Sequence, residues 1–193
     1  ALIIFVKNPK KGKVKTRLAA TVGADLALKI YKELLRHTRE IVIEIPATRY
    51  LFYSQQIADD DWSNELFQKK LQAAGDLGDK MKDAFGIALS NHQKAIIIGS
   101  DCASLTTEII GKAIEALDNY DVVIGPAMDG GYYLLGMTNM CASLFSDMPW
   151  STEAVFPLTI ERLKTDSVSY SLLPELSDID FEEDWEKYGW EIR

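Results

Sequence analysis

The sequence predicts an α/β fold with three layers, in which helices cover both faces of a mixed, mostly parallel sheet. Short apolar segments of strand length alternate along the chain with amphipathic segments of helix length. The helical segments are long enough to cross back between parallel strands, which is typical of this class. The length of 193 residues suffices for one such core and is short for two, so residues 1–193 are expected to form a single domain.

The expected strands are apolar runs bounded by turn residues. They cover residues 2–6, 48–53, 94–98, 121–125, 132–137 and 168–173. The expected helices have apolar residues at intervals of three and four. They cover residues 24–40, 59–68, 77–90, 106–118, 152–164 and 180–188. Because ligands of open α/β sheets bind at the carboxyl ends of the strands, the residues that follow strands are the candidates for a site.

Three helix starts carry capping signals. Thr106 is expected to cap its helix, and Ser151 or Thr152 the helix that follows them. Asp180, with Glu183 three residues later, has the spacing of a capping box.

The charge is distributed unevenly along the chain. The net charge is −8, yet residues 1–24 contain six basic residues and no acid, so the other 169 residues carry −14. A basic loop in an acidic protein favours a small anionic ligand, although a solvated loop is an equally weighted alternative on charge alone. The acidic remainder would repel a nucleic-acid backbone, so nucleic-acid binding is not expected.

The apolar runs are too short to span a bilayer, so no membrane span is expected. No signal peptide is recognisable at residues 1–6, because no basic region precedes this apolar run. Cys102 and Cys141 are far apart in the sequence and form no metal-binding pattern. They are interpreted as free thiols of a cytoplasmic protein.

The loop after the first strand, FVKNPKKGKVKTRL at residues 5–18, is the first candidate site. Arg17 offers a planar guanidinium for phosphate oxygens, and Lys7 and Lys15 offer compact charges. The loop is no Walker A motif, and no G-x-G-x-x-G or G-x-S-x-G pattern occurs. A nucleoside di- or triphosphate is the expected ligand.

Asp101 follows the buried strand at 94–98 and is the first candidate metal ligand. A carboxylate beside a phosphate site is well neutralised by Mg²⁺ or Mn²⁺, which bridge carboxylates and phosphate oxygens. Capping of the following turn is the alternative. A second ligand is expected from the acidic segment 175–186, where Asp178 and Asp180 are the candidates.

The segment GPAMDGGYYLLG at residues 125–136 is another candidate for part of the binding site. Gly130 and Gly131 allow a ligand to approach the backbone closely, although Asp-Gly is also a strong turn signal. Asp129 is the loop acid that is placed to act as a base. Trp150 and Ser151 are candidates for substrate binding, with core packing as the alternative for Trp150.

These motifs, in this order, resemble the nucleotide-diphospho-sugar transferases with the GT-A fold, and more narrowly the bacterial family named radical-SAM/selenodomain-associated transferase 1. The matching blocks span nearly the whole chain. They are Phe5-x-Lys7-x-Pro9-x-x-Gly12-x-x-Lys15-Thr16-Arg17-Leu18, Gly75-Asp76-Leu77-Gly78-Asp79-Lys80-Met81, Gly99-Ser100-Asp101-Cys102, Gly125-Pro126-x-x-Asp129-Gly130-Gly131-Tyr132-Tyr133, Trp150-Ser151-Thr152 and Asp178-Ile179-Asp180.

The chain departs from the family at Ala103, where the family has proline. Ala103 also replaces the second acid of the Asp-x-Asp motif of GT-A glycosyltransferases, so Asp101 alone remains of it. The resemblance implies a glycosyltransferase that uses a nucleotide sugar, a small-molecule acceptor and Mg²⁺ or Mn²⁺. It also favours Asp180 over Asp178 as the second metal ligand, because the family pattern ends on Asp180. One alternative is a nucleotidyltransferase, similar to guanylyltransferases, that joins an NTP to a phosphorylated small molecule. A non-catalytic nucleotide-binding module is the other.

Overall fold

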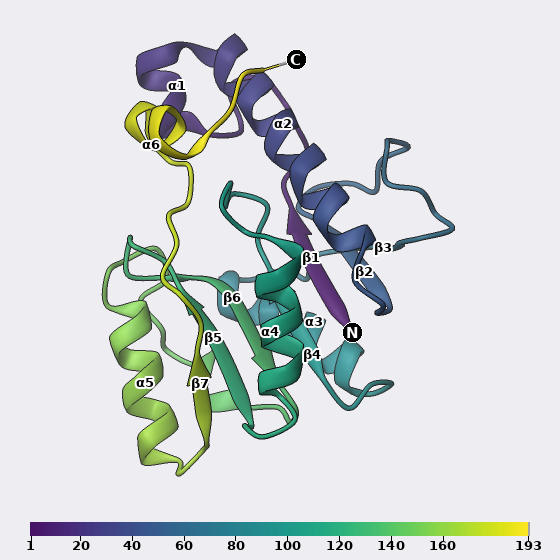
Figure 1. The fold of residues 1–193 in the computed structure, drawn as a ribbon, viewed down its shortest axis with the longest axis vertical. Helices are drawn as coiled ribbons and strands as arrows, with labels where there is room; N and C mark the ends of the chain where they lie inside the picture. Colours follow the sequence, from purple (N-terminus) through teal and green to yellow (C-terminus); the bar gives the residue numbers. More distant parts are fainter. Residues whose placement is uncertain (193) are drawn as a thin grey trace.

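The computed structural model describes residues 1–192 and shows a central sheet between two layers of helices (Figure 1). In these residues seven strands form one sheet, in the order β3-β2-β1-β4-β6-β5-β7. The strands are β1 (Leu2–Val6), β2 (Arg49–Tyr53), β3 (Gln68–Leu71), β4 (Ala95–Ile98), β5 (Val122–Pro126), β6 (Tyr132–Met137) and β7 (Tyr170–Leu172). Strand β6 is antiparallel to both of its neighbours, and the other pairs are parallel. The predicted fold class is confirmed.

The helices divide between the two faces of the sheet. They are α1 (Thr16–Val22), α2 (Ala24–Ile43), α3 (Leu77–Leu89), α4 (Thr107–Ala116), α5 (Val155–Thr165) and α6 (Glu182–Tyr188), with a short 3₁₀ helix at Ala142–Leu144. Helices α2 and α4 pack on one face, and α3 and α5 pack on the other. Strand β1 shows the alternation, because Ile4 belongs to the first core and Ile3 to the second. Both residues are fully buried.

The predicted helix at 59–68 is wrong. This segment is a loop that leads into the edge strand β3. Its apolar residues have another purpose: Trp62 is buried and packs edge-to-face on Phe67, with ring centroids 4.9 Å apart. The Tyr53 hydroxyl donates to the Asp60 carboxylate at 2.9 Å and holds the loop to β2. The local apolar spacing was therefore set by loop packing and not by a helix face.

Helix α1 was not predicted. It has seven residues, which is too short for apolar periodicity to show, and Leu18 is its buried residue. Lys15 before it and Gly23 after it both have positive φ, of 47° and 82°. The turn at Gly23 separates α1 from α2, so that the helices pack against each other and do not continue as one rod.

One of the three predicted caps is confirmed. The Thr106 hydroxyl accepts a hydrogen bond from the Ile109 N–H at 3.3 Å. Asp180 is no N-cap: α6 begins at Glu182 with Phe181 as its N-cap residue, and the Asp184 carboxylate accepts from the Phe181 N–H at 2.8 Å. Helix α5 begins only at Val155, after a turn in which Thr152 accepts from the Ala154 N–H at 3.4 Å.

After β7, the C-terminal segment crosses the carboxyl edge of the sheet and ends beside α1 and α2 (Figure 1). Helix α6 lies beside α1 and packs over a small third core that contains Leu18, Ile30 and Ile179 (Figure 1). The buried Ile179 is fixed to the end of β4, because its N–H donates to the Asp101 carbonyl at 2.9 Å. This anchor carries the flanking acids, Asp178 and Asp180, to the sheet edge.

Tyr31 of α2 connects the ends of β1 and β4. Its hydroxyl accepts from the Lys7 N–H at 2.8 Å, donates to the Lys7 carbonyl at 3.0 Å and lies 3.3 Å from the Ser100 hydroxyl. The side chain is buried. One phenol therefore satisfies polar groups that follow two neighbouring strands.

We expect Tyr31→Phe to lower the free energy of unfolding by about 1 kcal/mol, because the Lys7 backbone groups lose their buried partner. Urea denaturation measures this. Tyr120→Phe is the matched control, since Tyr120 is exposed and its hydroxyl makes no hydrogen bond within residues 1–192. Equal stability of the two variants would contradict the connecting role of Tyr31.

Candidate functional site

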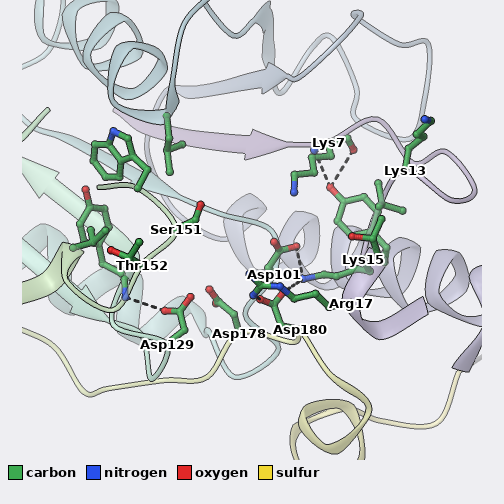
Figure 2. Close-up of a pocket in the computed structure, with 18 residues that line it drawn as sticks. Lys7, Lys13, Lys15, Arg17, Asp101, Asp129, Ser151, Thr152, Asp178 and Asp180 are labelled. Carbon is green, nitrogen blue, oxygen red and sulfur yellow. Dashed lines mark hydrogen bonds and ion pairs between the residues drawn. The ribbon is translucent and has the colours of Figure 1, made fainter. Parts of the chain in front are cut away.

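A cavity of about 420 Å³ opens at the edge of the sheet where β1 and β4 end. Nine of the ten residues predicted for the site line it: Lys7, Lys15, Arg17, Asp101, Asp129, Gly131, Trp150, Ser151 and Asp180. Figure 2 shows the lysines at one end, Asp129, Ser151 and Thr152 at the other, and the remaining acids between them. The cavity thus has a basic end and a polar end that no single stretch of sequence contains.

Lys15 is the buried cation of the site. Its side chain is only 4% exposed, and its Nζ lies 3.0 Å from Asp101 Oδ1 and 3.5 Å from Asp180 Oδ1. The left-handed backbone at Lys15, with φ of 47°, aims the side chain back at the sheet edge. A non-glycine residue in this conformation is strained, and such strain is typical of functional sites.

Arg17 is the exposed cation. Its Nη1 donates to Asp180 Oδ2 at 2.9 Å, and the guanidinium lies 6.0 Å from the centroid of the Phe181 ring. Lys7 and Lys13 also line the cavity, and within residues 1–192 they form no ion pair. The two paired and two unpaired cations together make this end of the cavity attractive to phosphate.

Asp178 sits among the other acids. The side chain keeps some solvent contact, yet its burial raises the pKa of Asp178 to about 7, and the nearby carboxylates of Asp101, Asp129 and Asp180 add to this effect. The Lys15 ammonium opposes it. A carboxylate crowded by others gains most from a further cation.

Asp101 has a cation partner within the chain, which sequence reasoning did not expect. The prediction of a metal at Asp101 assumed that the basic loop is committed to phosphates, but Lys15 forms an ion pair with this carboxylate. The need of Asp101 for a counter-charge therefore does not by itself require a metal. The position of Asp101, Asp178 and Asp180 at one cavity is a stronger argument for a metal site.

The loop between β5 and β6 positions Asp129. Its Oδ1 accepts from the Gly131 N–H at 2.9 Å, so the residue shapes the turn and also faces the cavity. Gly130 is not among the lining residues. Its φ is 86°, and a Cβ there would lie 2.4 Å from the Glu153 backbone, so close packing explains this glycine.

Trp150 and Ser151 form the wall opposite the basic loop. Ser151 has a positive φ of 65°, the second strained residue at the cavity. The Trp150 indole lies against Gly78, where a Cβ would come within 2.9 Å of its ring. Gly78 belongs to the first turn of α3, whose capping box joins Asp76 and Asp79.

A second cavity of about 340 Å³ adjoins the first. It shares Lys7, Tyr31, Leu77, Asp101 and Tyr132 with the first cavity. The remaining wall is largely apolar and includes Phe5, Met81 and Ile97, with Gln72 and Lys80 as polar groups. Sequence reasoning missed this cavity because its lining comes from apolar runs of β1, β4 and β6 that were interpreted as core, together with residues of α3.

The acids of the first cavity fit a divalent ion only together with a ligand. Carboxylate oxygens are the donors that Mg²⁺ and Mn²⁺ prefer. In the described part of the chain, however, no three acidic, histidine or cysteine side chains are arranged to hold a metal alone. Mg²⁺ is commonly bound by one or two carboxylates, with phosphate oxygens and water completing its shell, and this site suits that mode.

The sheet order and the cavity at its edge define an α/β domain similar to the nucleotide-diphospho-sugar transferases. Residues 37–152 match the family described as "Uncharacterized protein conserved in bacteria (DUF2064)", and the chain belongs to this family. It is 31% identical to a protein from Desulfovibrio desulfuricans G20 described as a "putative nucleotide-diphospho-sugar transferase". The TM-score is 0.87, with 93% of this chain and 81% of that chain covered.

More distant structures share the fold. CMP:2-keto-3-deoxy-manno-octonic acid synthetase complexed with CTP has a TM-score of 0.58 at 9% identity, with 97% of this chain and 95% of that chain covered. Rv0371C of Mycobacterium tuberculosis H37Rv, in complex with manganese, has a TM-score of 0.54 at 10% identity, with 97% and 96% covered. A search of curated proteins found no match.

Two further expectations concern the whole chain. Cys102 and Cys141 are free, as predicted. Among the described residues, no helix combines the length and apolar character that crossing a bilayer demands.

We expect Asp180→Asn to tighten the binding of inorganic pyrophosphate in EDTA by up to about fivefold. The Asp180 carboxylate competes with an anion for the exposed Arg17, and an exposed ion pair is worth at most about 1 kcal/mol. Calorimetric titration measures the affinity. Glu186→Gln removes one exposed negative charge of α6 outside the cavity and is the control. If both variants gain affinity for pyrophosphate equally, the effect comes from the net charge of the protein and not from the ion pairs of Asp180.

Proposed function

We propose that this protein is a glycosyltransferase that moves a sugar from a nucleotide diphosphate to a hydroxyl of a small acceptor. The observation that carries the proposal is the polarity of the first cavity. Cations suited to a diphosphate lie at one end, and the carboxylate of Asp129 lies at the other. A sugar attached to that diphosphate would extend from the basic end toward Asp129.

The residues divide into three tasks in this proposal. Lys7, Lys15 and Arg17 bind the diphosphate, and as it leaves they stabilise the charge that develops on it. The second, more apolar cavity accepts the nucleoside. Gly130, Gly131, Trp150 and Ser151 form or shape the wall that faces the sugar and the acceptor.

Asp129 is the proposed general base. It would take the proton of the acceptor hydroxyl while that oxygen attacks the anomeric carbon and the bond from this carbon to the phosphate oxygen breaks. Its hydrogen bond to the Gly131 N–H uses Oδ1 and holds the side chain in place. Oδ2 remains for the proton.

Asp101 and Asp180 are the proposed metal ligands, and Asp178 precedes Asp180 by two residues in the segment that Ile179 anchors. A bound Mg²⁺ or Mn²⁺ would neutralise phosphate charge there. Asp180 now contacts Lys15 and Arg17, so ligand binding exchanges these partners and brings the cations to the phosphates.

Nucleotidyl transfer from an NTP to a phosphorylated small molecule is the second candidate. The unpaired Lys7 and Lys13 favour it, since they offer charge for a third phosphate beyond the two that Lys15 and Arg17 can hold. Release of pyrophosphate from an NTP, with no release of nucleoside diphosphate from a nucleotide sugar, would select this reaction. A nucleotide-binding module without catalysis, the third reading, would give neither product.

We expect Asp101→Asn to abolish the enhancement of nucleotide binding by Mn²⁺, because the metal loses a charged ligand. Titration of UDP and GDP with Mn²⁺ and with EDTA measures the enhancement. The variant should also melt at a lower temperature, since the buried Lys15 loses its ion-pair partner. Glu115→Gln, on the exposed side of α4, removes one charge as a control. Metal-independent binding by the wild type would contradict the role of Asp101.

We expect Asp129→Asn to lower turnover by roughly 10²–10⁴ while nucleotide affinity changes little, because the amide cannot accept the proton. The asparagine oxygen can still accept from the Gly131 N–H, so the loop keeps its shape. Steady-state kinetics and titration of the nucleotide separate the two effects. Full activity of the variant would show that Asp129 only forms the turn.

A further inference from the structure

The first cavity is lined by residues with buried polar atoms that lack a hydrogen-bond partner. Across residues 1–192, three buried side-chain nitrogen or oxygen atoms have no hydrogen-bond partner: Lys15 Nζ, Tyr132 Oη and Trp150 Nε1. All three residues line the first cavity. The Lys15 ammonium is compensated by its ion pair with Asp101, whereas the other two atoms are neutral donors with no compensation.

Tyr132 and Trp150 form one aromatic corner. Their rings meet at 90° with centroids 6.5 Å apart, an edge-to-face arrangement. Gly78 leaves room for the indole, and the Phe145 carbonyl lies close to the same point. Tyr132 also lines the second cavity, so the corner stands where the two cavities join.

An unpaired donor in such a place is costly. A buried polar group without a partner costs about as much as a lost hydrogen bond, and native proteins contain few of them. Burial raises the pKa of Tyr132, so its hydroxyl keeps its proton at neutral pH and can donate. The neighbouring Tyr133 shows the ordinary solution, because its hydroxyl donates to the Pro174 carbonyl at 2.9 Å.

We propose that Tyr132 and Trp150 bind the sugar of the nucleotide sugar, with the phenol and the indole N–H hydrogen-bonding to its hydroxyl groups. The inference rests on the proposed function and assigns the specificity for the sugar to this corner. A pyranose suits it, because its hydroxyl oxygens accept from both donors and its C–H faces pack on aromatic rings. The two polar atoms are covered in the free protein, so binding requires small side-chain rotations, which are common when ligands bind.

A neutral nucleobase or an apolar acceptor fits the corner less well. A base bound there would draw its diphosphate away from the basic loop, because Trp150 directly precedes Ser151, which lies at the opposite end of the cavity from the lysines (Figure 2). An apolar acceptor would leave both donors without partners. The apolar second cavity is the better place for a base.

The test compares the affinity for a nucleotide sugar with that for its nucleoside diphosphate. Binding of UDP, UDP-glucose, GDP and GDP-mannose is measured with Mn²⁺ for the wild type and for Tyr132→Phe, Trp150→Phe and Tyr133→Phe. We expect Tyr132→Phe and Trp150→Phe each to reduce the preference for the sugar nucleotide by about threefold to tenfold, the range of one neutral hydrogen bond. Affinity for the free diphosphate should change less than affinity for the sugar nucleotide.

Thermal unfolding of the same variants separates binding from stability. Tyr132→Phe removes an unpaired hydroxyl, so its melting temperature should equal or exceed that of the wild type. Tyr133→Phe leaves the Pro174 carbonyl without its donor, so it should melt a few degrees lower and keep the preference for the sugar nucleotide.

The outcomes distinguish this inference from the proposed function. If the wild type binds the diphosphates and prefers the sugar nucleotides, but Tyr132→Phe and Trp150→Phe keep that preference, the sugar-binding corner is wrong and the proposed function stands. If Tyr132→Phe destabilises the protein as Tyr133→Phe does, the hydroxyl has a structural partner and the inference fails. A wild type that binds none of the four ligands contradicts both.

Discussion

The buried ammonium of Lys15 is the interaction on which the rest of the site depends. A charge that is almost wholly removed from water requires opposite charge nearby, and Asp101 and Asp180 supply it. These contacts join the loop after β1, the end of β4 and the segment before α6. Together with the Arg17–Asp180 pair, they keep two acids and two cations at one edge of the sheet, where the ion pairs can be exchanged for a phosphate and a metal.

The fold secures this cluster with neutral contacts that bring no charge of their own. The Tyr31 hydroxyl connects the ends of β1 and β4, and the buried Ile179 fixes the acidic segment to the Asp101 carbonyl. Helix α6 then covers α1 and α2, so the third core resists any displacement of the segment. Charged groups that would repel one another in an extended chain are thereby held together by the burial of apolar side chains.

Much of the fold was predictable because its signals are local. The strands β1, β4, β5 and β6 have apolar runs that both layers of helices bury. The Thr106 cap involves only a contact with Ile109, three residues later, so its local sequence predicts it. The errors occurred where the spacing of residue types fits more than one local structure. Trp62 and Phe67 pack a loop that resembles a helix in its spacing. At α6, Phe181 is the N-cap residue in place of Asp180, and Asp184 accepts from its N–H in place of Glu183.

The sequence by itself determined the chemistry of the site: a basic loop after the first strand, single acids after later strands and a glycine-rich turn with Asp129. These residues follow recognisable strands, and the carboxyl ends of parallel strands meet at one edge of the sheet. Only the tertiary structure decided their partners. The pairing of Lys15 with Asp101, the raised pKa of Asp178 and the unpaired donors of Tyr132 and Trp150 depend on distances between segments that lie far apart in the chain. Ion pairs and hydrogen bonds form only between groups a few ångströms apart, and the spacing of residues in the sequence does not encode those distances.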